Sequence, residues 1–321
     1  SRKQVQDWKQ MGLELSRTTM ANWVIQASRT WLKPLIEHMH DELLKEHYIH
    51  GDETRVQVLK EPEKKATSQS YMWVYSNISG SPHPITLFDY RPNRSSDNPK
   101  EYLKGFSGYL ITDAYAGYNH LEGVTNVYCW AHARRKFVEA LPKDRKGIED
   151  SLSCRAIEKI GKLFAIEKKI ADMDCEEKKR IRQNEAVPLL KDFFTWCFEN
   201  RDKTLKRSKV NKAFSYALDH QEGLCRYIED GHLPMTNSLD ERVIRPFTTG
   251  RKNWLFSDSV KGAESSGYVY SIIETAKDNQ IDPYKYLCFV FKNMPGSDYI
   301  RNREVIENLM PWSRQAQEIC K

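Results

Sequence analysis

The hydrophobic pattern of this chain changes its period twice along the sequence. Between residues 48 and 90, apolar, aromatic and β-branched side chains recur with the two-residue period that is typical of β-strands. Because turn residues separate these segments, we predict an antiparallel meander of three strands, at residues 48–59, 71–75 and 85–90. Short helices and apolar strands then alternate along the chain, and we place them at residues 98–104, 108–113, 124–128 and 131–141.

Apolar side chains recur with helical spacing on both sides of these strands. In residues 1–47 the spacing predicts packed helices that are compatible with a helix-turn-helix, although any pair of packed helices has the same pattern. Residues 147–231 have no strand pattern, which predicts an all-helical insertion. Beyond it we expect a helix at residues 237–245 that ends at Pro246, because proline interrupts the helical hydrogen-bond ladder, and a long helix at residues 262–278.

Three antiparallel strands followed by helix, strand, helix and strand form the element order of the ribonuclease H-like fold, which retroviral integrases share. We therefore predict an α/β protein with a mixed sheet and helices on both of its faces. The predicted parts are an N-terminal helical segment, a first part of the core, the helical insertion, a second part of the core and a C-terminal helical element. They correspond to residues 1–47, 48–146, 147–231, 232–280 and 281–321.

The composition indicates a globular protein of a reducing compartment. Of the 321 residues 40% are hydrophobic and 29% charged, and no apolar run approaches the roughly 18 residues that a membrane-spanning helix needs. The seven cysteines are widely spaced and the first residues lack the apolar core of a signal peptide, so we expect the cytoplasm. The net charge of +6 permits a polyanionic partner. Residues 201–212 contain six cations against Asp202 alone, which indicates either a solvated surface or a phosphate contact.

Short acidic side chains lie where two predicted strands meet small or polar residues. Asp52 follows Gly51 in the first strand, and Asp113 ends the fourth. A strand-end Asp often only caps a turn, but two carboxylates facing one cleft would repel each other unless a cation such as Mg²⁺ bound there. A third carboxylate is expected on a later helix, where Glu241 is the candidate, although Ser238-x-x-Glu241 is also a capping box. The competing acids are Asp240, Glu264 and Glu274.

Several longer motifs follow one another along the chain. They are His50-x-Asp52-Glu53-Thr54, Tyr109-Leu110-x-Thr112-Asp113-x-Tyr115-x-Gly117-Tyr118, Cys129-Trp130-Ala131-His132-x-Arg134-Arg135-Lys136-Phe137, Asn237-x-x-x-Glu241-Arg242-x-Ile244-Arg245-Pro246, Gly250-Arg251-Lys252-Asn253-Trp254-Leu255-Phe256, Ile273-Glu274-Thr275-Ala276-Lys277 and Asp282-Pro283-Tyr284-x-Tyr286-Leu287. On these motifs the chain resembles the transposases of the insertion-sequence-66 family, whose catalytic domain carries an Asp-Asp-Glu triad. The family's N-terminal zinc-binding cysteine cluster has no counterpart in this sequence, and Ser238 stands where the family usually has a second Asn.

The resemblance implies that Asp52, Asp113 and Glu241 form the triad, and that the helical stretch between the last two is the family's insertion into the fold. It also implies a DNA transposase with two Mg²⁺ ions, replaceable by Mn²⁺, about 3.5–4 Å apart, with Asp52 bridging both. Water would cleave a phosphodiester at the element end, and the freed 3′-hydroxyl would then attack target DNA. Double-stranded DNA is the expected partner, and holding two DNA ends implies a homodimer or larger assembly.

Basic residues of the same motifs are candidates for phosphate contacts: Arg134, Arg135, Lys136, Arg245, Arg251 and Lys252. Some residues have two interpretations. Trp254 could stack on an exposed base or pack in the core, His132 could contact DNA or serve the structure, and Arg245 could instead pair with a neighbouring acid. Two alternative functions fit the same residues: a ribonuclease H-like metal-dependent nuclease without strand transfer, and a non-catalytic DNA-binding relic.

Overall fold

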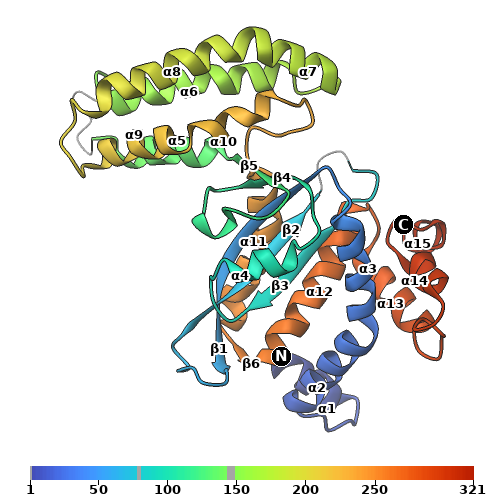
Figure 1. The fold of residues 1–321 in the computed structure, drawn as a ribbon. Helices are drawn as coiled ribbons and strands as arrows, with labels where there is room; N and C mark the ends of the chain where they lie inside the picture. The colour runs from blue at the N-terminus through green and yellow to red at the C-terminus, as the bar shows by residue number, and fades with distance from the viewer. Residues whose placement is uncertain (1, 78–80, 143–148) are drawn as a thin grey trace. The chain divides into compact units, whose positions relative to one another are not determined.

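The computed structural model of the chain describes residues 2–77, 81–142 and 149–321, apart from the side chains of residues 2 and 238–241. Within these ranges six strands form a mixed sheet in the order β3–β2–β1–β4–β5, and β6 pairs with β1 off this path (Figure 1). The chain divides into two compact units. Unit 1 comprises residues 1–46, 51–105 and 240–321, and unit 2 comprises residues 47–50 and 106–239.

The strands confirm the α/β class that the sequence predicts, and the ribonuclease H-like assignment stays a prediction. Strands β2 and β3 pair antiparallel, whereas β4 runs parallel to both β1 and β5. Strands β1 to β5 lie within two residues of their predicted bounds, because runs of apolar and β-branched side chains are a strong local signal, whereas β6 was not predicted. The bounds are β1 (Tyr48–Lys60), β2 (Gln69–Ser76), β3 (Thr86–Arg91), β4 (Gly108–Thr112), β5 (Val124–Tyr128) and the short β6 (Ser257–Ser259).

Helix α12 (Val260–Asp278) packs directly on strand β3 in unit 1. The hydroxyl of Ser271 accepts the N–H of Phe88 at 2.8 Å, and the hydroxyl of Thr275 accepts the N–H of Thr86 at 3.0 Å. These bonds satisfy backbone groups that an edge strand would otherwise expose. Gly267 permits the close approach, since a Cβ there would lie 2.8 Å from the Phe88 carbonyl oxygen.

Helix α11 (Ser238–Trp254) continues through Pro246, so the predicted helix end at this proline is wrong. An interior proline costs about 3 kcal/mol. The residues around it, Val243, Ile244 and Phe247, are buried in a cluster with side chains from β1, β2 and β3. Burying three such side chains stabilises by roughly 5–9 kcal/mol, which outweighs the cost of the proline.

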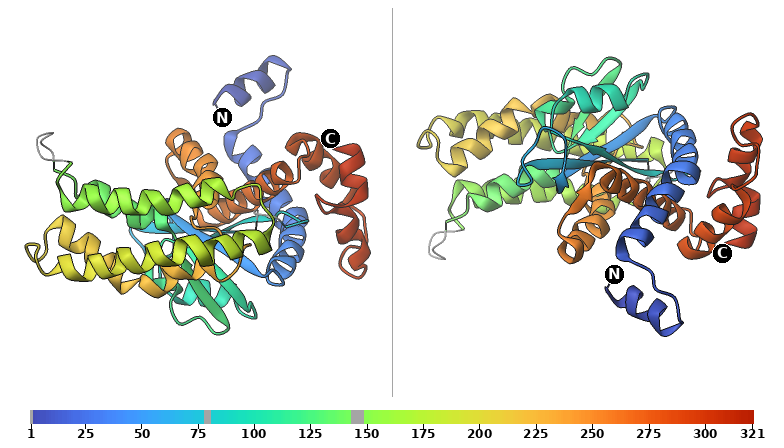
Figure 2. Two further views of the ribbon diagram at one scale, coloured as in Figure 1. Left: turned by 90° about the horizontal axis from the view of Figure 1, so that it is seen from above. Right: turned by 90° about the horizontal axis from the view of Figure 1, so that it is seen from below.

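The other helices of unit 1 include those nearest the two chain ends. Helix α1 (Arg2–Gln10) projects from the rest of this unit in both views of Figure 2, and its described side chains are exposed apart from a half-buried Val5. None of the helices in the described part of the chain is long and apolar enough to cross a membrane. The remaining elements are α2 (Arg17–Ala27), a π-helical turn (Ser28–Leu32), α3 (Lys33–Leu43), α4 (Asp97–Tyr102), α13 (Pro283–Asn293), α14 (Arg303–Leu309) and α15 (Arg314–Ile319).

Unit 2 combines β4, β5 and the first residues of β1 with a two-layered set of helices. Helices α6 and α8 form one layer and α5, α9 and α10 the other (Figure 1). Aromatic rings pack between the layers, and Phe137 of α5 lies edge-on to Phe193 of α8 with 6.2 Å between ring centroids. The helices are α5 (Trp130–Glu139), α6 (Leu152–Lys169), α7 (Cys175–Ile181), α8 (Val187–Arg201), α9 (Lys209–Asp219) and α10 (Gln221–Cys225).

Candidate carboxylate site

Two adjacent acids occur on β1, and the structure distinguishes between them. Glu53 is almost fully buried, and one of its oxygens accepts bonds from Nε and Nη2 of Arg94, the former at 2.6 Å. This ion pair commits Glu53 to the structure of unit 1. Asp52 is half-buried, and its Oδ1 accepts the N–H of Glu53 at 2.8 Å. Asp52 is therefore the better candidate ligand of the two.

Asp113 directly follows β4, and its carboxylate is held in a tight turn. Its Oδ1 accepts the N–H of Tyr115 at 2.9 Å, an arrangement typical of an Asx turn. Ala114 has φ of +68°, a left-handed conformation that is costly for a residue with a Cβ and that clusters at functional sites. Oδ2 of Asp113 has no hydrogen-bond partner among the described residues, and the residue is half-exposed. The turn thus presents one carboxylate oxygen to an incoming ligand.

Asp52 on β1 and Asp113 directly after β4 lie at the same offset from the last registered residue pair of these two parallel strands. His50 pairs with Ile111 in the last registered position. Asp52 lies two residues after His50, and Asp113 lies two residues after Ile111. Asp52 belongs to unit 1 and Asp113 to unit 2.

His50 connects β1 to the segment that precedes α11. Its Nδ1 lies 2.7 Å from Oδ1 of Asn237, and because an amide oxygen only accepts, Nδ1 carries the proton. The N–H of Asn237 also bonds to Sγ of Cys129, at 3.1 Å. All three residues are buried, and burial lowers the pKa of His50 to about 4, so the imidazole is neutral at physiological pH. Nε2 of His50 has no hydrogen-bond partner among the described residues.

For the third predicted ligand, Glu241, the structure describes the helix but not the side chain. Glu241 belongs to α11, but its side chain and that of its competitor Asp240 lie outside the described residues. The two other competitors are on α12, where each lies within ion-pairing distance of a cation. Glu264 is 3.8 Å from Arg29, and Glu274 is 2.8 Å from Lys277.

The predicted phosphate-contact residues lie on two helices. Arg134, Arg135 and Lys136 are exposed on α5, and Arg245 and Lys252 are exposed on α11. The sixth predicted residue, Arg251, also belongs to α11 and has partners within unit 1. Arg251 donates hydrogen bonds to Oγ1 of Thr54 and to the carbonyl of Arg55.

Trp254 is half-buried, and its ring lies edge-on to Phe247 at 5.4 Å, beside the apolar cluster under α11. The packing interpretation of Trp254 accounts for this position. His132 is half-buried in the first turn of α5. Its backbone N–H donates to the carbonyl of Cys129 at 3.2 Å.

The sequence did not reveal the contacts that hold the acids in place. The hydroxyl of Tyr216 on α9 donates to the backbone carbonyl of Asp113 at 2.9 Å, although 103 residues separate them. His50 and Asn237 both occur in the motifs above, but no pattern indicates that they bond to each other. Partners so distant in sequence leave no local signal.

Among the residues that the structure describes, no group of three or more His, Cys, Asp or Glu side chains could hold a metal ion. The donor chemistry of Asp52 and Asp113 nevertheless fits Mg²⁺, which prefers carboxylate oxygens and retains several waters. Asp113 is half-exposed, and its Oδ2 has no hydrogen-bond partner among the described residues, so it is available for such a contact. Each of the two aspartates therefore has donor chemistry that suits a divalent metal ion.

Comparison with known proteins gives matches along nearly the whole chain. A family model described as "Transposase IS66 family" matches residues 1–265, and one described as "IS66 C-terminal element" matches residues 271–312. Among curated relatives, "Uncharacterized protein y4hP" of Sinorhizobium fredii is 28% identical over 318 residues, which cover 94% of this chain and 56% of the relative. "Uncharacterized protein y4jD" of the same organism is 27% identical over 330 residues, covering 99% and 63%. The chain thus spans less than two thirds of the length of these relatives.

Proposed function

The chain belongs to the IS66 family of transposases, and on this premise we propose that it cleaves and joins DNA strands, using Asp52, Asp113 and Glu241 as metal-binding carboxylates. Divalent ions held there, Mg²⁺ or Mn²⁺, would activate the attacking oxygen and stabilise the leaving oxygen of a phosphodiester. The reaction would begin with cleavage at the element end. Transfer of the freed 3′-hydroxyl to target DNA would follow, in an assembly of two or more copies on DNA.

The observation that carries this proposal is the presentation of Asp113. The residue directly follows a strand of a parallel pair, it is half-exposed beside the strained turn at Ala114, and its Oδ2 has no hydrogen-bond partner among the described residues. The partner strand β1 carries Asp52 at the equivalent offset from the last registered pair, His50 and Ile111. Each acid thus lies two residues beyond the last registered pair on its own side of the ladder, which supports the proposal that both belong to one ligand set.

The residues of the chain have separate tasks in this mechanism. Asp52, Asp113 and Glu241 hold the metal ions in their ionised form, so activity requires deprotonated carboxylates. Asn237, four residues before Glu241, is held by His50 and Cys129, so the segment that leads into α11 is fixed at this point. The cations of α5, Arg134, Arg135 and Lys136, and those of α11, Arg245, Arg251 and Lys252, would bind backbone phosphates.

The decisive experiment substitutes Asp113→Asn, which keeps the shape of the side chain and removes its charge. We expect Mn²⁺-dependent cleavage of a supercoiled plasmid to fall by about a hundredfold or more, because a metal ligand is lost. The matched control is Asp172→Asn, an exposed acid in unit 2. Cleavage by Asp113→Asn at the wild-type rate would contradict the proposal.

A joining assay separates the transposase from the nuclease alternative. A labelled oligonucleotide with a precut 3′-end is incubated with a supercoiled target and Mn²⁺. Transfer of the label to the target is the result expected of a transposase. Target that is cut but never labelled would favour the nuclease alternative, and DNA binding without either product would favour the relic.

A further inference from the structure

Unit 2 carries a dense group of cations between α8 and α9. Five exposed cations occur within ten residues, and none has an ion-pair partner among the described residues: Lys203, Lys206, Arg207, Lys209 and Lys212. The acid in this stretch, Asp202, pairs instead with Arg201 at 3.1 Å. In the other helices of unit 2, cations such as Lys159, Lys169 and Arg180 pair with acids. The group between α8 and α9 therefore carries uncompensated positive charge.

Helix stability does not explain these cations. Lys209 and Lys212 occupy the first turns of α9, where the helix dipole disfavours positive charge by about 0.3–1 kcal/mol per cation at an exposed position. The first turn contains no acidic residue. A sequence under selection for the stability of α9 alone would place acids here, so the charge favours interaction with an anionic partner.

The loop that carries the preceding cations is held in one conformation. The side-chain amide of Asn211 donates to the carbonyl of Arg201 at 3.0 Å and to the hydroxyl of Thr204 at 3.0 Å, and its oxygen accepts the N–H of Arg207 at 3.3 Å. Arg207 has φ of +66°, a strained conformation that these bonds stabilise. A loop ordered in advance loses less entropy when its cations bind a partner.

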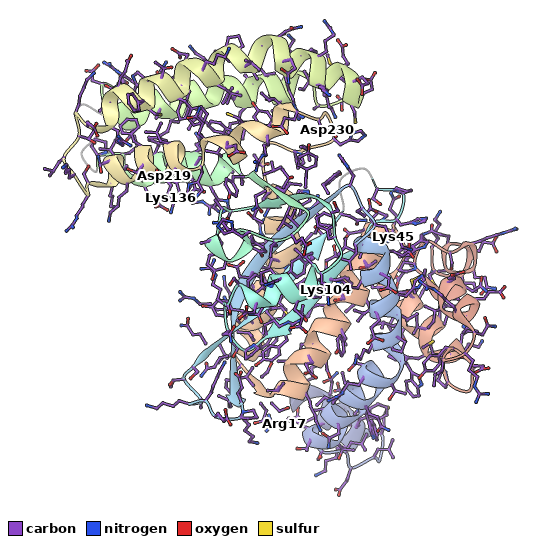
Figure 3. The ribbon with its side chains drawn as sticks, viewed as in Figure 1. Arg17, Lys45, Lys104, Lys136, Asp219 and Asp230 are labelled. Atoms are coloured by element: carbon purple, nitrogen blue, oxygen red, sulfur yellow. The ribbon has the colours of Figure 1, made fainter. Side chains whose placement is uncertain are left out.

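The charged face of α9 leads to Asp113. Lys209, Lys212 and Tyr216 are spaced by three and four residues, so they share one face of the helix over roughly 10 Å. Lys136 of α5, labelled in Figure 3, places its Nζ 5.6 Å from the centroid of the Tyr216 ring. The hydroxyl of the same tyrosine donates to the carbonyl of Asp113. These contacts all lie within unit 2.

We propose that the loop at residues 203–207, the Lys209–Lys212–Tyr216 face of α9 and Lys136 of α5 form a docking surface for duplex DNA that guides the sugar-phosphate backbone toward Asp113. The occupant is a polyanion because the surface is cationic and unpaired, and it is DNA because the surface leads to the carboxylate of the proposed active site. This inference rests on the proposed function. Asp219, one turn beyond Tyr216, is an acid on the same face and opposes the interaction at that end.

The test measures binding of the full chain to a short fluorescein-labelled duplex, by fluorescence anisotropy in EDTA over a range of salt concentrations. The double substitution Lys209→Gln/Lys212→Gln should weaken binding, and the slope of log affinity against log salt should fall by about two, one for each lost phosphate contact. Asp219→Asn should act in the opposite direction and tighten binding, because it removes a charge that repels phosphate.

The control is Lys162→Gln/Lys168→Gln, which removes two exposed lysines from α6 of the same unit. An unchanged slope for the α9 double variant, an equal fall for the α6 control, or the absence of DNA binding by the wild type would overturn the proposal. The measurement in EDTA does not depend on metal-assisted chemistry. The binding test can therefore contradict the docking surface while Asp113-dependent cleavage is still observed. Likewise, cleavage can prove independent of Asp113 while the docking surface is supported.

Discussion

The hydroxyl of Tyr216 donates a hydrogen bond of 2.9 Å to the backbone carbonyl of Asp113. This bond ties helix α9 to the turn after β4 that presents the Asp113 carboxylate. Burial raises the pKa of Tyr216 and the nearby charge of Asp113 raises it further, so the hydroxyl keeps its proton and remains a donor. This bond is thus one of the links within unit 2 between the helical layers and the parallel strands.

Replacing Tyr216 by Phe should affect both stability and cleavage. The lost bond leaves the Asp113 carbonyl without this donor, at a cost of about 1 kcal/mol in the free energy of unfolding, measured by urea titration. Cleavage should fall as well, because the turn that orients the carboxylate loosens. Tyr128→Phe is the matched control, since its hydroxyl bonds to Asn119 at 3.2 Å in the same unit. Equal cleavage by the two variants would argue against an orienting role for Tyr216.

Replacing Asn237 by Ala should destabilise unit 2. The substitution leaves the buried ring Nδ1–H of His50 without its acceptor, which lowers the free energy of unfolding by about 1–3 kcal/mol. Urea unfolding followed by circular dichroism measures the loss. Asn253→Ala, at an exposed position of α11, should be nearly neutral. A loss at position 237 no larger than at 253 would show that the His50–Asn237 bond contributes little.

The stability of unit 1 should depend on pH through Asp89. Burial raises the pKa of its carboxyl to about 6, even though Arg91, 2.5 Å away, favours the ionised form. The folded state therefore holds this proton more tightly than the unfolded chain, in which the Asp pKa is about 3.9. The stabilisation that this proton provides is complete below about pH 4 and is lost as the pH rises through 6.

Asp89→Asn removes this titration. The unfolding free energy of the wild type should decline relative to that of Asp89→Asn by about 1–3 kcal/mol between pH 4 and 7. Parallel urea titrations of both proteins at several pH values measure the difference. A difference that stays constant, or that grows in favour of the wild type as the pH rises, would refute the assignment.

Arg182 should be among the most sensitive positions of the helical layers. Its buried guanidinium forms two bonds to Glu167, at 2.9 and 2.7 Å, and donates to the carbonyls of Tyr227 and Asp230. Arg182→Met should cost about 3–5 kcal/mol, because these partners lose their donor.

A control for Arg182 lies two residues earlier on the same segment. Arg180 forms an exposed ion pair with Glu177, so Arg180→Met should cost less than about 1 kcal/mol. Thermal and urea unfolding compare the two variants. Similar losses at both positions would mean that the buried ion pair does not stabilise the helical layers.

Local patterns predicted most elements of the fold. The predicted strand at residues 124–128 coincides with β5, and the predicted fourth strand ends one residue beyond β4, because runs of apolar and β-branched side chains are a property of neighbours in the chain. The predicted end of α11 at Pro246 was wrong, because contacts between distant residues override the local signal there. A local rule ends the helix there, whereas burial of Val243, Ile244 and Phe247 against distant strands continues it.

In the candidate site, too, local sequence patterns predicted some features, and contacts between distant residues decided others. The sequence predicted Asp52 and Asp113 as ligands from their positions at strands, but it gave no sign that the neighbouring Glu53 pairs with a cation. That cation, Arg94, lies 41 residues from Glu53. The sequence alone shows that cations are concentrated between residues 201 and 212. Only the structure shows the hydrogen bond from Tyr216, on the same helix face as Lys209 and Lys212, to Asp113.

The amino-acid order alone determined the periodicity of the helices and strands, the positions of the acids and the placement of the basic residues, since each of these is a property of neighbours in the chain. Tertiary structure decided which polar groups bond to each other. His50 and Asn237 are 187 residues apart, and Tyr216 and Asp113 are 103 apart. Such pairs form only when folding removes water from both partners and leaves each with the other as its hydrogen-bonding group.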